Sequence, residues 1–491
     1  MNMFRRPLRM FLKRGMSTNF LITLLTSGLP LITTLVTVPI YISAIGTERY
    51  GVIALLLLLF GYLGLLDLGL SRATTFRLSQ LQSADRADYL AVYRTSIALN
   101  LALGMVLGSL FYFGAEVFLR YRDTGQWFVS EMADAIVPIA ILFPFTLASN
   151  ACIGRLEAEQ RFATLAAIGL PGAVLVQVAP IIFVHLFGVS IATAVYGIVA
   201  ARSINVAAFL IVHVVHDWHV ESRRRFSRQE AGNLLRYGAW VSVSNIASPL
   251  LVSADQFVLG YVAGPKSVAF YNLGFNLASK LLLLPGALAK VTFPRMVAAS
   301  PENLDQLANM SVRATAWMLF PLVSVAIAGA SPFFTHWISA EFAVEASATA
   351  QLLLAGVWIN SSAYVAVNIL MARGQTSWIA KLHFAELVPF IAVLWLCVSV
   401  IGVEGAAIAW SLRVTIDAIL MFYLAGMAKS VAKTLALPFC LIWLQVLYHL
   451  TVDVSAWVDV GFVLAALVVS GLGAFSTFQS VKASPVLAAT G

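Results

Sequence analysis

The chain has little charge and almost no cysteine. Only 11% of its 491 residues are Asp, Glu, Lys or Arg, and 60% are hydrophobic. Typical globular domains have about 25% charged and about 45–50% apolar residues. No stretch is polar enough to form a water-soluble domain of its own. The composition therefore excludes a soluble multidomain protein.

The three cysteines, Cys152, Cys397 and Cys440, lie singly in apolar segments. Their spacing matches neither a disulfide framework nor a zinc motif, so we expect small core residues. The HxxHxxH run at residues 213–219 would walk around a helix surface. We predict no metal site there or elsewhere.

Motifs for catalysis and for nucleotide binding are also missing from the sequence. No GxxxxGK[ST] sequence occurs, and the gaps between apolar segments are too short for a nucleotide-binding domain. We therefore expect neither an enzyme with catalytic residues nor a bound cofactor. Any work done by the protein should be driven by an ion gradient, the membrane potential or a downhill substrate.

Long apolar segments fill most of the chain. A membrane-spanning helix needs about 20 apolar residues, whereas a β-barrel would show alternating strands of about ten. We therefore predict an all-α integral membrane protein with about 14 transmembrane helices. The expected spans are 19–43, 50–70, 92–114, 133–153, 163–187, 190–213, 237–261, 267–289, 314–337, 346–370, 378–400, 404–427, 434–451 and 457–477.

Most of the 31 Lys and Arg residues fall in alternate gaps between these spans. Positive charge is retained on the cytoplasmic side during insertion, so both chain ends are expected in the cytoplasm. The net charge of +8 follows from this bias and implies no nucleic acid. The largest basic groups lie at 5–14, 72–94 and 223–236.

The basic run ESRRRFS, after the sixth span, would link two six-helix bundles. Both bundles enter from the cytoplasm, so we expect a pseudo-twofold axis along the membrane normal. The predicted organisation is a cytoplasmic amino terminus (1–18), a first bundle (19–216), a linker (217–233), a second bundle (234–430), two additional helices (431–478) and a cytoplasmic tail (479–491).

Two segments resemble bacterial polysaccharide repeat-unit flippases of the multidrug/oligosaccharidyl-lipid/polysaccharide exporter superfamily. They are TVPIYISAIGTERYGVIALLLLLFGYLGLLDLGL at 37–70 and SVAFYNLGFNLASKLLLLPGALAKVTFPRM at 267–296. The resemblance implies a flippase in the bacterial cytoplasmic (inner) membrane. Such a protein moves polyprenyl-pyrophosphate-linked oligosaccharide to the outer leaflet by alternating access, for O-antigen, exopolysaccharide or capsule.

The resemblance also implies partners. They are the lipid-linked oligosaccharide, membrane lipid, and the polysaccharide polymerase with its chain-length machinery. Two related functions stay open: a cation-coupled small-molecule exporter of the multidrug type, and a lipid II flippase.

Polar side chains within the spans are the candidates for a substrate cavity. An ionisable group in a bilayer is costly and usually faces a wet cavity or another such group. Asn272, Asn276 and Lys280 recur every four residues, which places them on one helix face. We expect a cavity built from these three residues with Arg202, Arg413, Asn360, Tyr364 and Asn368, and an inner basic rim of Arg72, Arg77 and Arg295.

Acidic residues within the spans are the candidates for ion coupling, with H⁺ or Na⁺ as the coupling ion. They are Asp255, Glu386, Asp417 and Asp67. The alternative is pairing with basic groups inside the protein, which the i, i+4 spacing of Arg413 and Asp417 would allow. The two helices from about Thr434 onward carry no charge in their apolar stretches apart from Asp459, near the start of the second; they would flank a lipid-facing groove or serve only for packing.

Overall fold

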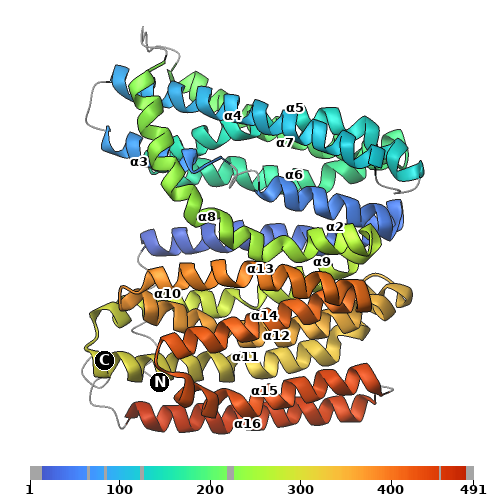
Figure 1. Cartoon of the computed structure of the whole chain (residues 1–491), viewed down its shortest axis with the longest axis vertical. Helices are drawn as coiled ribbons and strands as arrows, with labels where there is room; N and C mark the ends of the chain where they lie inside the picture. Colours follow the sequence, from blue (N-terminus) through green and yellow to red (C-terminus); the bar gives the residue numbers. More distant parts are fainter. Residues whose placement is uncertain are drawn as a thin grey trace. The chain divides into compact units, whose positions relative to one another are not determined.

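The computed structural model describes residues 14–62, 67–81, 86–121, 126–217, 226–452 and 455–482. Within these ranges the chain forms the helices α2 to α16 and no strand (Figure 1). A helix lies on each of the expected spans. Twelve stretches of the described helices are long and apolar enough to cross a membrane. The prediction of an all-α, multi-pass membrane protein is confirmed.

Parts of the predicted organisation fall outside the described residues. They are residues 1–13 of the amino terminus, 218–225 of the linker and 483–491 of the tail. The described residues divide between two compact units, Met1–Ile246 and Ala247–Gly491. The helix α8 (Arg228–Val262) contributes its first part to one unit and its remainder to the other.

Glycines with positive φ end one helix and begin the next. The long α2 (Arg14–Tyr62) is kinked at Gly46, where φ is 80°, and therefore covers parts of the first two expected spans. Gly402, with a φ of 74°, is the single residue between α13 (Thr376–Ile401) and α14 (Val403–Leu424). Glycine adopts such angles at little steric cost because it has no Cβ. These two turns therefore need no additional loop.

The first unit is held together by close helix crossings. Gly104 and Gly108 lie one turn apart on α4, and α5 crosses there with its backbone in contact. A Cβ added at Gly104 would lie 2.3 Å from the Cα of Pro144, and one at Gly108 would lie 2.5 Å from the carbonyl oxygen of Ala140. Such small-xxx-small pairs let membrane helices pack closely. Besides α2 and the start of α8, this unit contains α3 (Leu70–Gln80), α4 (Arg86–Tyr121), α5 (Gln126–Ala158), α6 (Phe162–Phe187) and α7 (Ile191–Asp217).

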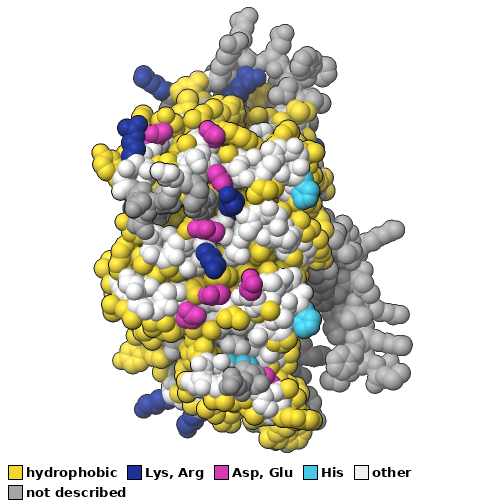
Figure 2. Space-filling model, turned by 90° about the vertical axis from the view of Figure 1, so that its right-hand side faces the viewer, with side chains coloured by type: hydrophobic (Ala, Val, Ile, Leu, Met, Phe, Trp, Pro, Cys, Tyr) yellow, Lys and Arg dark blue, Asp and Glu magenta, His cyan; other side chains and the backbone are white. Residues whose placement is uncertain are grey.

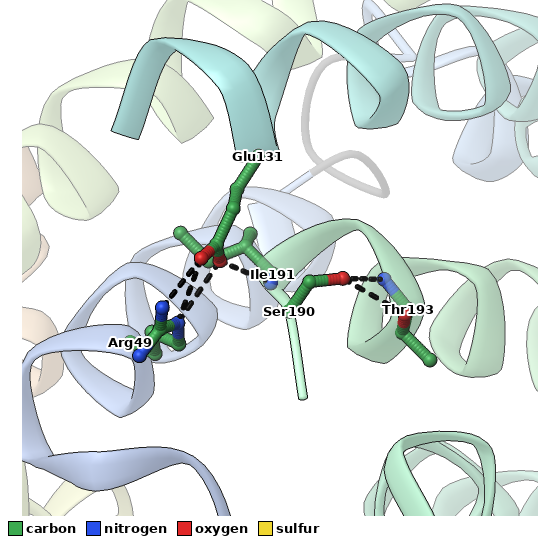
Figure 3. Close-up of polar contacts among 5 residues, drawn as sticks. All are labelled: Arg49, Glu131, Ser190, Ile191 and Thr193. Atoms are coloured by element: carbon green, nitrogen blue, oxygen red, sulfur yellow. Dashed lines mark hydrogen bonds and ion pairs between the residues drawn. The ribbon is translucent and has the colours of Figure 1, made fainter. Parts of the chain in front are cut away.

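An ion pair fixes one end of the first unit (Figure 3). Arg49 donates from Nε to Glu131 at 2.9 Å, and the same carboxylate accepts the backbone N–H of Ile191 at 2.7 Å. Ser190 caps the adjacent turn by accepting the N–H of Thr193 at 3.0 Å. One carboxylate on α5 therefore fixes the second part of α2 to the start of α7. The sequence placed Arg49 in a gap between spans and predicted no partner for it.

The second unit is built around α12, which is buried along most of its length. Trp358 of α12 is fully buried and stacks at a tilt on Phe320, with ring centroids 6.4 Å apart. At Gly356 an added Cβ would lie 2.4 Å from the hydroxyl of Ser411, so α14 crosses at close range. After the end of α8 this unit contains α9 (Pro265–Lys280), α10 (Leu283–Ala298), α11 (Pro301–Trp337), α12 (Ala340–Ala372), α13, α14, α15 (Ala428–Thr451) and α16 (Ala456–Lys482).

The two carboxyl-terminal helices pack on α11. The Gln445 amide accepts the Ser324 hydroxyl at 2.8 Å and donates to the Ser324 carbonyl at 3.0 Å, inside a buried contact. Gly473 of α16 lies against the ring of Trp317, since an added Cβ would approach it to 2.3 Å. A reciprocal hydrogen-bonded pair and a close crossing therefore fix both helices to the second unit.

Large apolar side chains cover much of the helix surface. Phe113, Val388, Leu396 and Leu472 are among the exposed ones. Figure 2 shows apolar side chains along the edges of one face, with most acidic side chains away from those edges. An exposed apolar surface of this extent is suited to lipid rather than water.

Candidate functional site

Two arginines lie at matching positions in the two units. Arg202 follows the start of α7 by eleven residues, and Arg413 follows the start of α14 by ten. At about 1.5 Å per residue, each lies about 15–17 Å along its helix. Both helices are the sixth expected span of their bundle. The two arginines therefore lie at about the same distance from the start of their helices.

Neither guanidinium is fully satisfied by the described part of the protein. The buried Nε atoms of Arg202 and Arg413 have no hydrogen-bond acceptor there. Each guanidinium instead lies over a phenylalanine ring, at 4.8 Å from the centroid of Phe60 and 5.2 Å from that of Phe390. A cation–π contact offsets only part of the cost of burial. Both groups retain donors that an anionic ligand could use.

Arg413 lines a cavity between α13 and α14. The cavity measures about 270 Å³ and is apolar except for Arg413 and Glu386. Glu386 is nine-tenths buried, and neither of its carboxylate oxygens has a hydrogen-bond partner among the described residues. Arg413 and Asp417 interact with it electrostatically. Glu386 is therefore a buried carboxyl group with both a cationic neighbour, Arg413, and an acidic one, Asp417.

The same helix pair brings His383 to Asp417. Their closest approach is 3.7 Å, between Nε2 of His383 and Oδ1 of Asp417. With Glu386 and Arg413 they form a cluster of four ionisable groups, which we call the α13–α14 cluster. The i, i+4 spacing had suggested that Arg413 and Asp417 neutralise each other. The described contacts instead spread the charge over two helices.

A second polar set joins α8 to α9. Asp255, fully buried, accepts the hydroxyl of Tyr271 and the backbone N–H of Gln256. The side-chain amides extend this series of hydrogen bonds: Asn272 donates to Gln256 at 2.7 Å, and Asn276 donates to Asn272 at 2.6 Å. The predicted stripe of Asn272 and Asn276 is therefore a hydrogen-bonded seam that ends on Asp255.

Aromatic rings connect this seam to α14. Tyr271 stacks on Phe275 at 5.9 Å between centroids, and Phe275 meets Trp410 edge-on at 5.4 Å. Trp410 lies three residues before Arg413 on the same helix. The seam and the α13–α14 cluster therefore belong to one packed region of the second unit.

The remaining predicted cavity residues lie apart from the cluster. Lys280 is the last residue of α9 and its side chain is exposed. On α12, Asn368 donates to the carbonyl of Ala289 at 3.0 Å, which fixes α12 to α10. Asn360 is half-buried and Tyr364 is exposed. Lys280 and Tyr364 are the two of these with accessible side chains.

The three arginines of the predicted inner rim, Arg72, Arg77 and Arg295, do not share one environment. Arg72 is exposed, whereas Arg77 makes a two-point ion pair with Glu230 of α8, at 2.7 and 3.0 Å. The side chain of Arg295 lies outside the described residues. Asp67 accepts the backbone N–H groups of Gly69 and Ser71 and so caps the start of α3. Its carboxylate oxygens are therefore occupied by backbone donors.

The pair between Arg77 and Glu230 gives a pH prediction. The hydrogen bonds from Arg77 hold the pKa of Glu230 below its usual range. Because the folded pKa is lowered, the pair stabilises the fold fully above the unfolded pKa, about 4.3, and less as pH falls through the folded value. The melting temperature of the parent protein should exceed that of Glu230→Gln at pH 7, and the difference should shrink below about pH 4.

A matched control for this measurement is Asp305→Asn. Asp305 pairs with Arg373 at 2.8 Å, but its side chain is 55% exposed, so its contribution should be small at any pH. A difference for Glu230→Gln that stays constant from pH 7 to pH 3 would show that the ion pair does not stabilise the first unit.

Several residues of the site had not been assigned a role from the sequence. Tyr271 and Gln256 hold Asp255 and the amide seam, and Phe60 and Phe390 cover the two arginines. None stands out in an apolar sequence. His383, one turn before Glu386, had a visible spacing signal, but its neighbour Asp417 is on another helix.

The helix arrangement is similar to that of two solved membrane proteins. It is similar to an inward-facing multidrug resistance MATE family transporter of the MOP superfamily, with a TM-score of 0.66 at 18% identity over 84% of this chain and 99% of that one. It is also similar to the lipid II flippase MurJ in an inward closed conformation, with a TM-score of 0.71 at 12% identity over 94% of this chain and 99% of that one.

The sequence itself defines the family. Residues 12–300 match the family described as "Polysaccharide biosynthesis protein". Over 385 residues the chain is 26% identical to a protein of Shigella flexneri named "Putative O-antigen transporter", covering 77% of this chain and 90% of that protein. The chain belongs to the polysaccharide biosynthesis protein family, and the family resemblance expected from the sequence is confirmed.

Proposed function

We propose that the protein is a flippase for polyprenyl-pyrophosphate-linked oligosaccharide. The observation that carries the proposal is the pair of partly buried arginines, Arg202 and Arg413, each with a buried Nε that has no hydrogen-bond acceptor among the described residues. A guanidinium is a fork of donors suited to phosphate oxygens. A pyrophosphate passing between the leaflets would supply the acceptors that both groups lack.

Other predicted cavity and rim residues could bind the sugar and attract the anionic head group of the substrate. Lys280 and Tyr364 have accessible side chains, and a cation and an aromatic ring are suited to phosphate and to a sugar face respectively. Arg72, exposed at the start of α3, would attract the anionic head. Family membership and the similarity to an O-antigen transporter favour lipid-linked sugar over a small-molecule drug.

The proposal includes the location and the direction of transport. The multi-pass fold and the family favour the bacterial inner membrane, with both termini in the cytoplasm by the positive-inside rule. The substrate would be loaded from the cytoplasmic leaflet and released in the outer one, where a polymerase with its chain-length machinery would use it. Alternating access of the two units would perform the transfer.

We propose the α13–α14 cluster as the ion-coupling site. Glu386 and Asp417 are buried carboxylates close to His383 and Arg413, so binding of H⁺ or Na⁺ would change the charge around Arg413 directly. Asp255 is less suited to this role because Tyr271 and Gln256 occupy its oxygens. Asp67 is committed to capping α3.

Reconstitution in proteoliposomes tests both parts of the proposal. A polyprenyl-diphosphate-linked oligosaccharide with a fluorescent sugar is placed in one leaflet, and transfer is read by an impermeant quencher. Parent protein should transfer it, and faster under an H⁺ or Na⁺ gradient. Glu386→Gln should lose the gradient response, while Glu345→Gln, at an exposed position of α12, should keep it. Absence of transfer by the parent protein would overturn the proposed function.

A further inference from the structure

A second cavity lies in the other half of the same unit, among α9, α11 and α12. It measures about 320 Å³, and every residue that lines it is apolar. Leu277 comes from α9 and Leu281 directly follows its end, Gly329 and Phe333 come from α11, and Ala350 and Leu354 come from α12. The floor is buried and Phe333 at the rim is exposed. We call this cavity the α9–α11 groove.

The glycines explain why the groove is open. Gly274 keeps α9 and α12 close together, because an added Cβ would lie 3.2 Å from the Cα of Ala350. Gly329 has the opposite surroundings: an added Cβ would meet nothing within 4 Å. The absence of a side chain at position 329 therefore leaves space that packing does not require.

A cation directly precedes one of the residues that line the groove. Leu281 lines it, and the residue before Leu281 is Lys280, the exposed last residue of α9. Gly274 and Leu281 are about 10 Å apart along the chain axis at 1.5 Å per residue. An apolar channel of this length beside a single ammonium group complements an amphiphile with a linear hydrocarbon chain and an anionic head.

We propose that the α9–α11 groove binds the head-proximal part of the substrate's isoprenoid chain, with Lys280 at the diphosphate. This inference rests on the proposed function, since it assigns the lipid half of the same substrate. The isoprenoid chain already lies in hydrocarbon, so the groove would bind it through van der Waals packing, as membrane helices bind one another. The lipid-facing groove expected at the last two helices stays a separate prediction, since the packing of α15 and α16 on α11 does not test it.

The test fills the groove without removing a contact. Gly329→Leu places a side chain in the open space, and Gly471→Leu on α16 is the matched control, since an added Cβ there also meets nothing within 4 Å. The probe is a polyprenyl-diphosphate-linked monosaccharide with a diazirine in its isoprenoid chain, used on full-length protein in nanodiscs. A phosphatidylglycerol with a diazirine in its acyl chain is the second probe.

We expect the isoprenoid probe to label peptides of α9 and α11 around Leu281 and Phe333. Labelling should fall at least fivefold in Gly329→Leu, remain unchanged in Gly471→Leu, and be competed by unlabelled polyprenyl diphosphate. Lys280→Gln, which adds no volume, should also reduce labelling by the isoprenoid probe. It replaces Gly329→Leu as the test variant if Gly329→Leu does not accumulate in the membrane.

Two results would overturn the groove assignment. One is labelling that survives both Gly329→Leu and Lys280→Gln. The other is equal labelling by the phosphatidylglycerol probe without competition, which would identify a site for bulk lipid. Both results are measured by labelling and not by transfer. They can therefore contradict the groove assignment without contradicting the proposed function, which absence of transfer by the parent protein would overturn.

Discussion

Transfer of the lipid-linked oligosaccharide should fall by at least a hundredfold when Arg202 and Arg413 are both replaced by glutamine. A hydrogen bond to a charged group contributes about 1.5–3 kcal/mol, and each 1.4 kcal/mol is about tenfold. Each single replacement should therefore reduce transfer by about ten- to a hundredfold. Replacement by lysine keeps the charge but loses the planar fork of donors, so transfer should be intermediate.

Replacement of Arg202 should reduce transfer without reducing the stability of the fold. An incompletely paired, partly buried cation such as Arg202 destabilises the fold that contains it, so Arg202→Gln should leave the melting temperature equal or higher. Arg120→Gln is the control, because Arg120 pairs at the surface with Glu116 and is largely exposed. Normal transfer by the double variant would show that the two arginines do not bind the substrate.

Replacement of Gly104 by valine should abolish accumulation of folded protein. The Cβ would lie 2.3 Å from a backbone atom of Pro144, and backbone cannot move aside as a flexible side chain can. Overpacking of a tight site costs about 1–3 kcal/mol and sometimes more, and here two long helices must separate. We expect loss of the monodisperse peak in fluorescence-detected size-exclusion chromatography.

The matched control is Gly114→Val on the same helix, where an added Cβ meets nothing within 4 Å. Both variants introduce the same β-branched residue into α4, so helix propensity is equal and only the crossing differs. Equal accumulation of the two variants would mean that the α4–α5 crossing does not require glycine.

The positions of the apolar helices were predictable because hydropathy is a local property, although about 14 spans were expected and twelve stretches of the described helices qualify. A run of about 20 apolar residues spans a membrane whatever its neighbours are. The turns were less visible: Gly46 joins two expected spans within one kinked helix, α2, and Gly402 joins two helices without a loop. Each depends on one backbone angle, which hydropathy does not report.

The partners of charged residues could not be predicted, because they depend on contacts distant in sequence. Arg77 and Glu230 are 153 residues apart, and Arg49 and Glu131 are 82 apart. The amide stripe of Asn272 and Asn276 was visible from its spacing, but its attachment to Gln256 was not. The roles of the candidate cavity residues stay predictions, since burial alone does not distinguish a binding group from a packing group.

The single-residue turn at Gly402 limits how the α13–α14 cluster can move. Near the turn, a Cβ at Gly405 would lie 2.1 Å from the carbonyl oxygen of Cys397, so the two arms are also in backbone contact. Two helices joined in this way cannot slide past each other by a turn. His383 and Asp417 should therefore keep their register if the hairpin moves. In the proposed coupling, a proton or sodium ion bound at the cluster would act on both helices together, and not on one side chain alone.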